Sequence, residues 1–310
     1  MAIKVAPMSL IRMIPVAAMS VVLVSQPAAA QDGRVLAPSS HWELNYDDDS
    51  CVLRRGFGSE GEGVFFELRQ FAPGLSYQML LVSPDLAVGD ESPTIRYGSD
   101  GDSWKPRDAV IVEYDGGLEG VLLGDSMLST ATKAELRDLD EDERTLRYQA
   151  LAMDMAALSD RESSVETITV GEVFGEDVTL RTGSMKPPMD AMRECTGEME
   201  RRWGFDPAVQ QTLSRHATPR NGHRLARRVQ QVYPRAMRNT NQSARLRIRL
   251  DIDEQGSVTG CHFQLPVEQE AFREDACNSL MPAQFEPALD ADGNPVASYW
   301  TTAISYLMSW

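Results

Sequence analysis

The sequence predicts an α+β protein in which a β-rich N-terminal domain, sandwich-like or barrel-like, precedes a small C-terminal domain. Short apolar or alternating runs, separated by Gly, Pro, Asp and Ser, fill residues 42–182, which is typical of antiparallel sheets. Residues 244–253 alternate strictly between apolar and polar side chains, as a half-buried strand does. Residues 31–185 contain 13 Lys and Arg against 31 Asp and Glu, whereas residues 186–310 contain 15 of each. This change in charge indicates a domain boundary.

The first 30 residues have the features of an export signal. Lys4 and Arg12 supply positive charge, residues 13–24 form a mostly apolar run, and residues 28–30 are three alanines. Cleavage before Gln31 would release the chain into the periplasm. Residues 13–30 carry no charge and just reach the length of a membrane span, so an uncleaved anchor in the inner membrane is the alternative.

Four cysteines in an exported chain predict disulfides, because the compartments outside the cytoplasm are oxidising. The four are Cys51, Cys195, Cys261 and Cys277. Three pairings are open. Cys51–Cys195 with Cys261–Cys277 is favoured, because each bond would then lie within one domain.

The N-terminal domain is expected over residues 31–185, with several short strands and two helices, at 133–140 and 143–158. Residues 145–148 fit a strand equally well. A further helix is predicted for 187–203, because Pro187 and Pro188 suit a first turn and apolar residues recur at helical spacing. Residues 186–232 form this helix and an Arg-rich linker, and residues 233–310 form the C-terminal domain.

The basic stretch lies in residues 201–249, which contain 12 arginines and a single acid, Asp206. For residues 205–232 three interpretations are open: a solvated helix face with a linker, docking on the acidic N-terminal half, and contact with anionic lipid or an acidic receptor surface. An exported chain with a net charge of −16 excludes nucleic acid as a partner.

The C-terminal domain is expected to contain a three-stranded antiparallel sheet with helices on one face. The strand at 244–253 turns at Gly256 and returns through 257–264, a helix covers 268–280, and a last strand follows in 296–308. The arginines of the first strand point to one side, which is expected to be solvated.

Several short motifs follow one another in this domain. They are Tyr233-Pro234, Ala236, Asp253 with Gly256, Phe285-Glu286-Pro287-Ala288 and Gly293-Asn294-Pro295-Val296. In order and spacing the segment resembles the C-terminal domain of the TonB family, periplasmic proteins that engage outer-membrane transporters. The resemblance covers about a quarter of the chain.

The chain also departs from that family. A TonB-type energy transducer keeps an N-terminal membrane helix and has a long Pro-rich linker. Here the N-terminus resembles a cleavable signal, and no Pro-rich stretch follows. In the family a Gln-x-Gln precedes Tyr-Pro, whereas here Val232 replaces the second glutamine after Gln230 and Gln231. The departures favour receptor binding over energy transduction.

The resemblance implies a non-enzymatic protein without cofactor or metal that binds partners in the periplasm. The expected partner is an outer-membrane TonB-dependent receptor or another envelope protein, and the binding mode is addition of a peptide strand to a sheet edge. Candidate partner-binding residues form one set: Gln231, Tyr233, Pro234, Tyr299, Thr301 and Thr302. The alternative is a structural or self-associating envelope protein without a role in transport. The sequence leaves the oligomeric state open.

The N-terminal half is similar to small periplasmic domains of the invasion-associated locus B type. The similarity consists of a first strand that begins with Trp42, an early Cys51 and a closing helix. It assigns no functional residue.

Two further motifs indicate chemistry that the rest of the chain does not support. Residues 121–128 resemble the nucleophile block of GDSL hydrolases, with Ser126 in place of the nucleophile, but the Asp-x-x-His of that family is missing. A Ser126 hydrolase is the least favoured function. Residues 251–256 resemble the start of a calcium loop, but His262 stands where that loop needs a glutamate.

Overall fold

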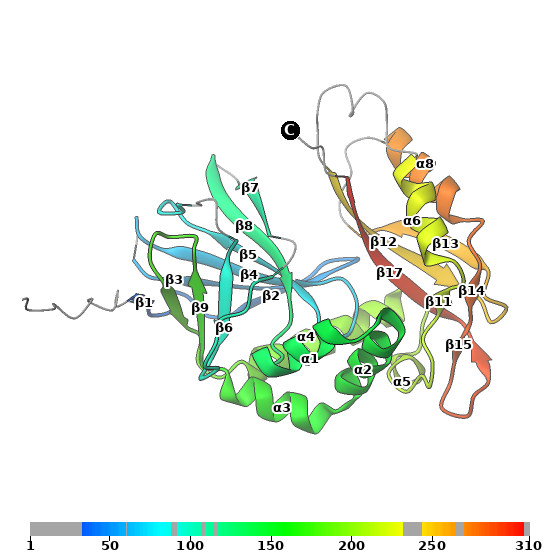
Figure 1. Cartoon of the computed structure of the whole chain (residues 1–310), viewed down its shortest axis with the longest axis horizontal. Helices are drawn as coiled ribbons and strands as arrows, with labels where there is room; N and C mark the ends of the chain where they lie inside the picture. Colours follow the sequence, from blue (N-terminus) through cyan, green and yellow to red (C-terminus); the bar gives the residue numbers. More distant parts are fainter. Residues whose placement is uncertain are drawn as a thin grey trace, which may run out of the picture. The chain divides into compact units, whose positions relative to one another are not determined.

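The computed structural model describes residues 33–59, 61–87, 92–106, 109–114, 117–231, 244–264 and 270–306 (Figure 1). Residues from Gly33 onward form one compact unit. The predicted signal peptide, residues 1–30, lies outside the described residues. Most buried apolar side chains gather in two large cores, one in each half of the chain.

The first core is built on a six-stranded antiparallel sheet in the order β2-β3-β4-β5-β8-β7. Its strands are β2 (Glu43–Tyr46), β3 (Cys51–Phe57), β4 (Val64–Gln70), β5 (Tyr77–Val82), β7 (Val110–Tyr114) and β8 (Leu118–Asp125). Every residue of β5 is buried, as expected for a strand in the middle of a sheet. Leu53 of β3 lies opposite Leu68 of β4, and both side chains point into the core.

A four-stranded sheet in the order β1-β10-β9-β6 shares this core. Its strands are β1 (Arg34–Leu36), β6 (Thr94–Tyr97), β9 (Thr167–Gly171) and β10 (Val178–Arg181). The β1–β10 pair is parallel and the other two pairs are antiparallel. The predicted α+β class with a β-rich N-terminal half is confirmed.

Three consecutive helices cover a smaller cluster of apolar side chains. They are α1 (Thr130–Asp138), α2 (Glu141–Met153) and α3 (Met155–Ser164). Ser129, Asp140 and Asp154 cap their N-termini by accepting hydrogen bonds from Thr132 N, Glu143 N and Ala157 N. The prediction of one helix over 143–158 is wrong because Asp154 ends α2 and caps α3.

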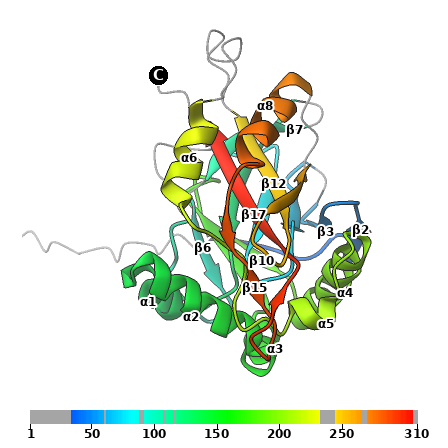
Figure 2. The same cartoon turned by 90° about the vertical axis from the view of Figure 1, so that its right-hand side faces the viewer.

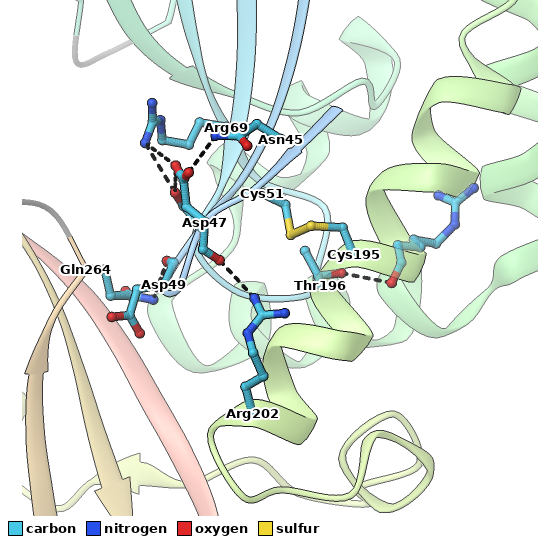
Figure 3. The surroundings of a disulfide bond; sticks show 11 residues. Asn45, Asp47, Asp49, Cys51, Arg69, Cys195, Thr196, Arg202 and Gln264 are labelled. Carbon is cyan, nitrogen blue, oxygen red and sulfur yellow. Dashed lines mark hydrogen bonds and ion pairs between the residues drawn. A yellow bond between two sulfur atoms is a disulfide. The ribbon is translucent and has the colours of Figure 1, made fainter. Parts of the chain in front are cut away.

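Helix α4 (Lys186–Arg202) packs into the first core through one stripe of side chains. Pro187 and Pro188 lie in its first turn, where a missing backbone N–H leaves no hydrogen bond unmade. Cys195 on this helix forms a disulfide with Cys51 of β3. Figure 3 shows that this bond ties the helix to the sheet.

The second core lies under a three-stranded antiparallel sheet in the order β13-β12-β17. The main elements of this half are α5 (Pro207–Gln210), α6 (Gly222–Gln231), β12 (Ala244–Ile252), β13 (Val258–Phe263), α8 (Glu270–Leu280) and β17 (Ser298–Tyr306). The short strands are β11 (Thr218–Pro219), β14 (Phe285–Glu286), β15 (Ala288–Leu289) and β16 (Pro295–Val296). Helices α6 and α8 lie on the same side of the sheet (Figures 1 and 2).

The apolar face of β12 supplies the centre of this core. Ile248, Leu250 and Ile252 are almost fully buried, as their alternation predicts. Cys261 of β13 forms a disulfide with Cys277 of α8, so the favoured pairing of all four cysteines is present in the structure. Gly256 has a φ of +80°, and a Cβ there would lie 2.1 Å from the carbonyl oxygen of Phe285. The turn therefore requires glycine.

The segment predicted as a linker contributes to both cores. Trp203 packs against the first core, and Leu213, Ala217 and Leu225 belong to the second. The domain boundaries at 185 and 232 remain predictions.

Candidate partner-binding surface

Strand β17 is an edge of the C-terminal sheet. Over its whole length, from Ser298 to Tyr306, it pairs with β12. In the described part of the chain no strand pairs with its other side. An edge strand presents a row of backbone N–H and C=O groups to which another strand can add.

The register shows which backbone groups of β17 point outward. The N–H of Gln264 donates to the carbonyl oxygen of Arg247, so the backbone groups of Arg247 face β13. Neighbouring residues of a strand alternate in this direction, so the groups of Ile248 face β17. Thr302 lies opposite Ile248 and is bonded to it, and the backbone groups of Thr301 therefore point to the free side.

The polar face of the sheet packs against the N-terminal half. Arg249 is 4% exposed. Its Nη1 lies 3.0 Å from Asp49 Oδ1, its Nε lies 3.0 Å from Asp251 Oδ1, and its guanidinium carbon lies 4.2 Å from the centre of the Trp203 ring. The prediction that this face is solvated is therefore wrong for Arg249.

The acidic run at residues 47–49 takes part in this contact rather than forming a freely solvated loop. Asp49 Oδ1 also accepts a hydrogen bond from Trp203 Nε1, at 3.0 Å. The backbone oxygen of Asp49 accepts from Gln264 Nε2. Figure 3 shows Asp47 of the same run between Arg69 and Arg202, next to the disulfide. The acidic run thus connects β2 and β3 to α4 and to the C-terminal sheet.

Tyr299 of β17 occupies the same interface. Its hydroxyl donates to Glu200 Oε1 of α4 at 2.5 Å, and its ring packs against Trp203 and Phe205. Glu200 is 1% exposed. Its second oxygen, Oε2, has no hydrogen-bond partner among the described residues. Burial raises the pKa of Glu200 to about 7, and the hydrogen bond from Tyr299 only partly opposes this.

Comparison with protein families gives a match in the C-terminal half. Residues 229–308 fit the family model described as the Gram-negative bacterial TonB protein C-terminal. Residues 229–308 match the TonB C-terminal domain. No curated protein matches the chain. The similarity of the N-terminal half to the invasion-associated locus B type remains a prediction.

The match places β17 within the TonB C-terminal domain. Arg249 and Asp251, which form the C-terminal side of the interface, also lie within that domain. Asp49, Trp203 and Glu200, which hold the polar face of the domain, lie before it in the sequence. Sequence reasoning missed these three residues. A weak signal existed for Glu200, which borders the apolar stripe of its helix, but none distinguished Asp49 from its acidic neighbours.

The predicted partner-binding residues of the TonB C-terminal domain fall into four groups. Tyr233 and Pro234 lie outside the described residues. Gln231 is exposed at the last position of α6. Thr301 and Thr302 are half-buried on β17, where only the backbone of Thr301 points outward. The Tyr299 side chain is engaged with Glu200, so its contribution to the surface is through the backbone.

The other motifs lie apart from this surface. Ser126 is buried directly after β8, and its neighbour Asp125 forms an ion pair with Lys133 at 2.8 Å. His262 forms a hydrogen bond with Asp251 at 2.7 Å within the C-terminal sheet. Among the described residues, no group of three or more potential metal ligands is present, and no helix has the length and apolarity to cross a bilayer.

We expect the stability of the folded chain to depend on pH through the buried Glu200. Its pKa of about 7 in the folded chain exceeds the value of about 4.3 in the unfolded chain, so the folded state binds a proton that the unfolded state releases between these values. We expect Glu200→Gln to abolish the loss of stability that this group causes as pH rises from 5 to 7. Gln keeps an acceptor for Tyr299 without ionising.

The measurement is the free energy of unfolding of both proteins at pH 5 and at pH 8. The wild type should be the less stable protein at pH 8, whereas the two should differ little at pH 5. The same pH dependence in both proteins would contradict the role of Glu200.

Proposed function

We propose that this chain is a non-catalytic protein of the Gram-negative cell envelope that binds an extended peptide at β17. The expected partner is an outer-membrane TonB-dependent receptor. The single observation that supports this most directly is that β17, inside the TonB C-terminal domain, pairs on one side only among the described residues. The N-terminal half takes the polar face of the sheet, and this leaves its two edge strands, β13 and β17, as surfaces on which a strand can add. Of these, β17 is the longer and offers the longer ladder.

Main-chain hydrogen bonds supply affinity in this binding mode, and they depend little on side chains. A proline test therefore separates the two sides of β17. Proline removes a backbone N–H and is tolerated in an edge strand only where that N–H faces outward. Thr301 has its N–H outward, whereas the N–H of Thr302 is bonded to β12.

The test peptide carries the TonB box of a receptor, the segment with which the TonB C-terminal domain pairs. We expect Thr301→Pro to weaken its binding by about tenfold, because one intermolecular hydrogen bond is lost. The melting temperature should change little. Isothermal titration calorimetry with the full chain measures the affinity. The control is Thr301→Val, which keeps the N–H and should bind as the wild type does.

Thr302→Pro is the matched variant on the inner side of the strand. It should lower the melting temperature, because it breaks the β12–β17 ladder. Equal peptide affinity in the wild type and Thr301→Pro would contradict strand addition at this edge. Absence of any peptide binding by the wild type would favour the structural envelope protein instead.

A further inference from the structure

A groove in the C-terminal half combines arginines with an apolar floor. It has a volume of about 180 Å³ and runs between the start of α6 and the residues that follow α8. Arg220, Arg224 and Arg228 line it at intervals of four residues, and Leu225 and Pro282 contribute apolar surface. Arg224 and Arg228 lie four residues apart on α6, so their side chains share one face of the helix, whereas Arg220 reaches the groove from the turn before it.

These arginines are largely free to meet a ligand. Arg220 forms an ion pair with Glu286 at 2.9 Å, and both side chains are about half exposed, where such a pair contributes little. Arg224 is exposed and Arg228 half-buried, and neither forms an ion pair with another described residue. Guanidinium groups bind carboxylates in a bidentate manner. The groove therefore suits an acidic segment that also carries apolar side chains.

An anionic bilayer is the poorer occupant. The chain carries a net charge of −16, so most of its surface repels a continuous anionic layer. The charge of the groove is local, and it matches a discrete acidic segment.

Helix α2 presents a surface of that kind. Leu146 is 66% exposed and Met153 is 53% exposed, and with Ala150 they form one stripe at helical spacing. Glu143 precedes Leu146 by three residues, so it lies on the same stripe and is exposed.

The opposite face of α2 is also apolar. Tyr148, Leu151 and Ala152 on that face pack against the cluster under α1 and α3. One apolar face of α2 is therefore buried within the chain, and the other is exposed. An exposed apolar stripe of this kind marks an interaction site for a partner.

We propose that the exposed stripe of α2 in one copy of this chain docks into the arginine groove of a second copy. Glu143 meets Arg224 and Arg228, and Leu146 with its apolar neighbours meets the floor around Leu225. Because the two surfaces differ, the contact is head-to-tail and links copies into a chain or a ring. Neither surface includes the edge of β17, so this self-association is independent of peptide binding.

Sedimentation velocity over a concentration series tests this with the full chain and its disulfides intact. The wild type should associate as concentration rises, and 0.5 M salt should weaken the association. Arg224→Glu should weaken it at least tenfold, because it places like charges together. Arg181→Glu is the matched control, because Arg181 is an exposed arginine at the end of β10 and its substitution makes the same change in charge.

The double variant Arg224→Glu with Glu143→Arg restores opposite charges and should associate again. Leu146→Ser, which leaves every charge in place, should weaken association as well. A wild type that stays monomeric at every concentration would overturn the proposal. So would equal effects of Arg224→Glu and Arg181→Glu, or binding of the monomer to anionic phospholipid vesicles that Arg224→Glu abolishes.

Discussion

Replacing both Cys51 and Cys195 by alanine is expected to lower the free energy of unfolding by about 5 kcal/mol. The bond closes a loop with a sequence separation of 144 residues. In the chain-entropy model the loss of freedom that a disulfide imposes on the unfolded chain grows with the logarithm of loop length. This bond therefore destabilises the unfolded state more than the other disulfide does.

The second disulfide supplies the matched control. Cys261–Cys277 has a sequence separation of only 16 residues, for which the same model gives about 3 kcal/mol. Both double variants remove two sulfur atoms. The difference between their losses in free energy of unfolding therefore reports the effect of loop length. Urea unfolding of the oxidised proteins, followed by circular dichroism, measures both values. Equal losses in the two variants would contradict the entropic account.

The position of the first disulfide gives its loss a second consequence. Cys51 begins β3 shortly after the acidic run, and both Cys195 and Glu200 lie on α4, which ends next to Trp203. Removal of the bond would loosen both elements that hold the polar face of the C-terminal sheet. We therefore expect proteolysis to cleave at this interface in the variant that lacks Cys51–Cys195, and not in the variant that lacks Cys261–Cys277.

The C-terminal sheet was predictable because its signals are local. Strict alternation in β12 reports burial on one face, and it identified Ile248, Leu250 and Ile252 correctly. Gly256 marks a turn by its freedom to adopt a positive φ. The motifs from Phe285 to Val296 then gave the family that the comparison supports.

The polar face was not predictable from the same alternation. A pattern of period two shows that Arg249 lies opposite the apolar core, but it does not show what covers that side. The covering residues, Asp49 and Trp203, are distant in the sequence, and their contact depends on the tertiary fold. The break at Asp154 was missed for another reason: apolar spacing continues across it, and only the capping geometry separates the helices.

Replacing Arg249 by methionine is expected to lower the free energy of unfolding by about 3 kcal/mol, in the lower part of the range for breaking a buried ion pair. The side chain of Arg249 is 5% exposed, whereas those of Asp49 and Asp251 are 30% and 21% exposed. Water therefore partly compensates the two carboxylates that lose their cation. Methionine fills a similar length, so the loss reports charge and cation–π contact rather than a cavity.

A double-mutant cycle with Asp49→Asn assigns the effect. If the ion pair dominates, Arg249→Met should lose less stability in the Asp49→Asn background than in the wild type. If packing on Trp203 dominates, the loss should be the same in both backgrounds. A total loss below about 1 kcal/mol would place the pair among ordinary surface salt bridges. In that case the N-terminal half would not hold the sheet through Arg249, and Glu200 with Tyr299 would be the remaining polar contact to test.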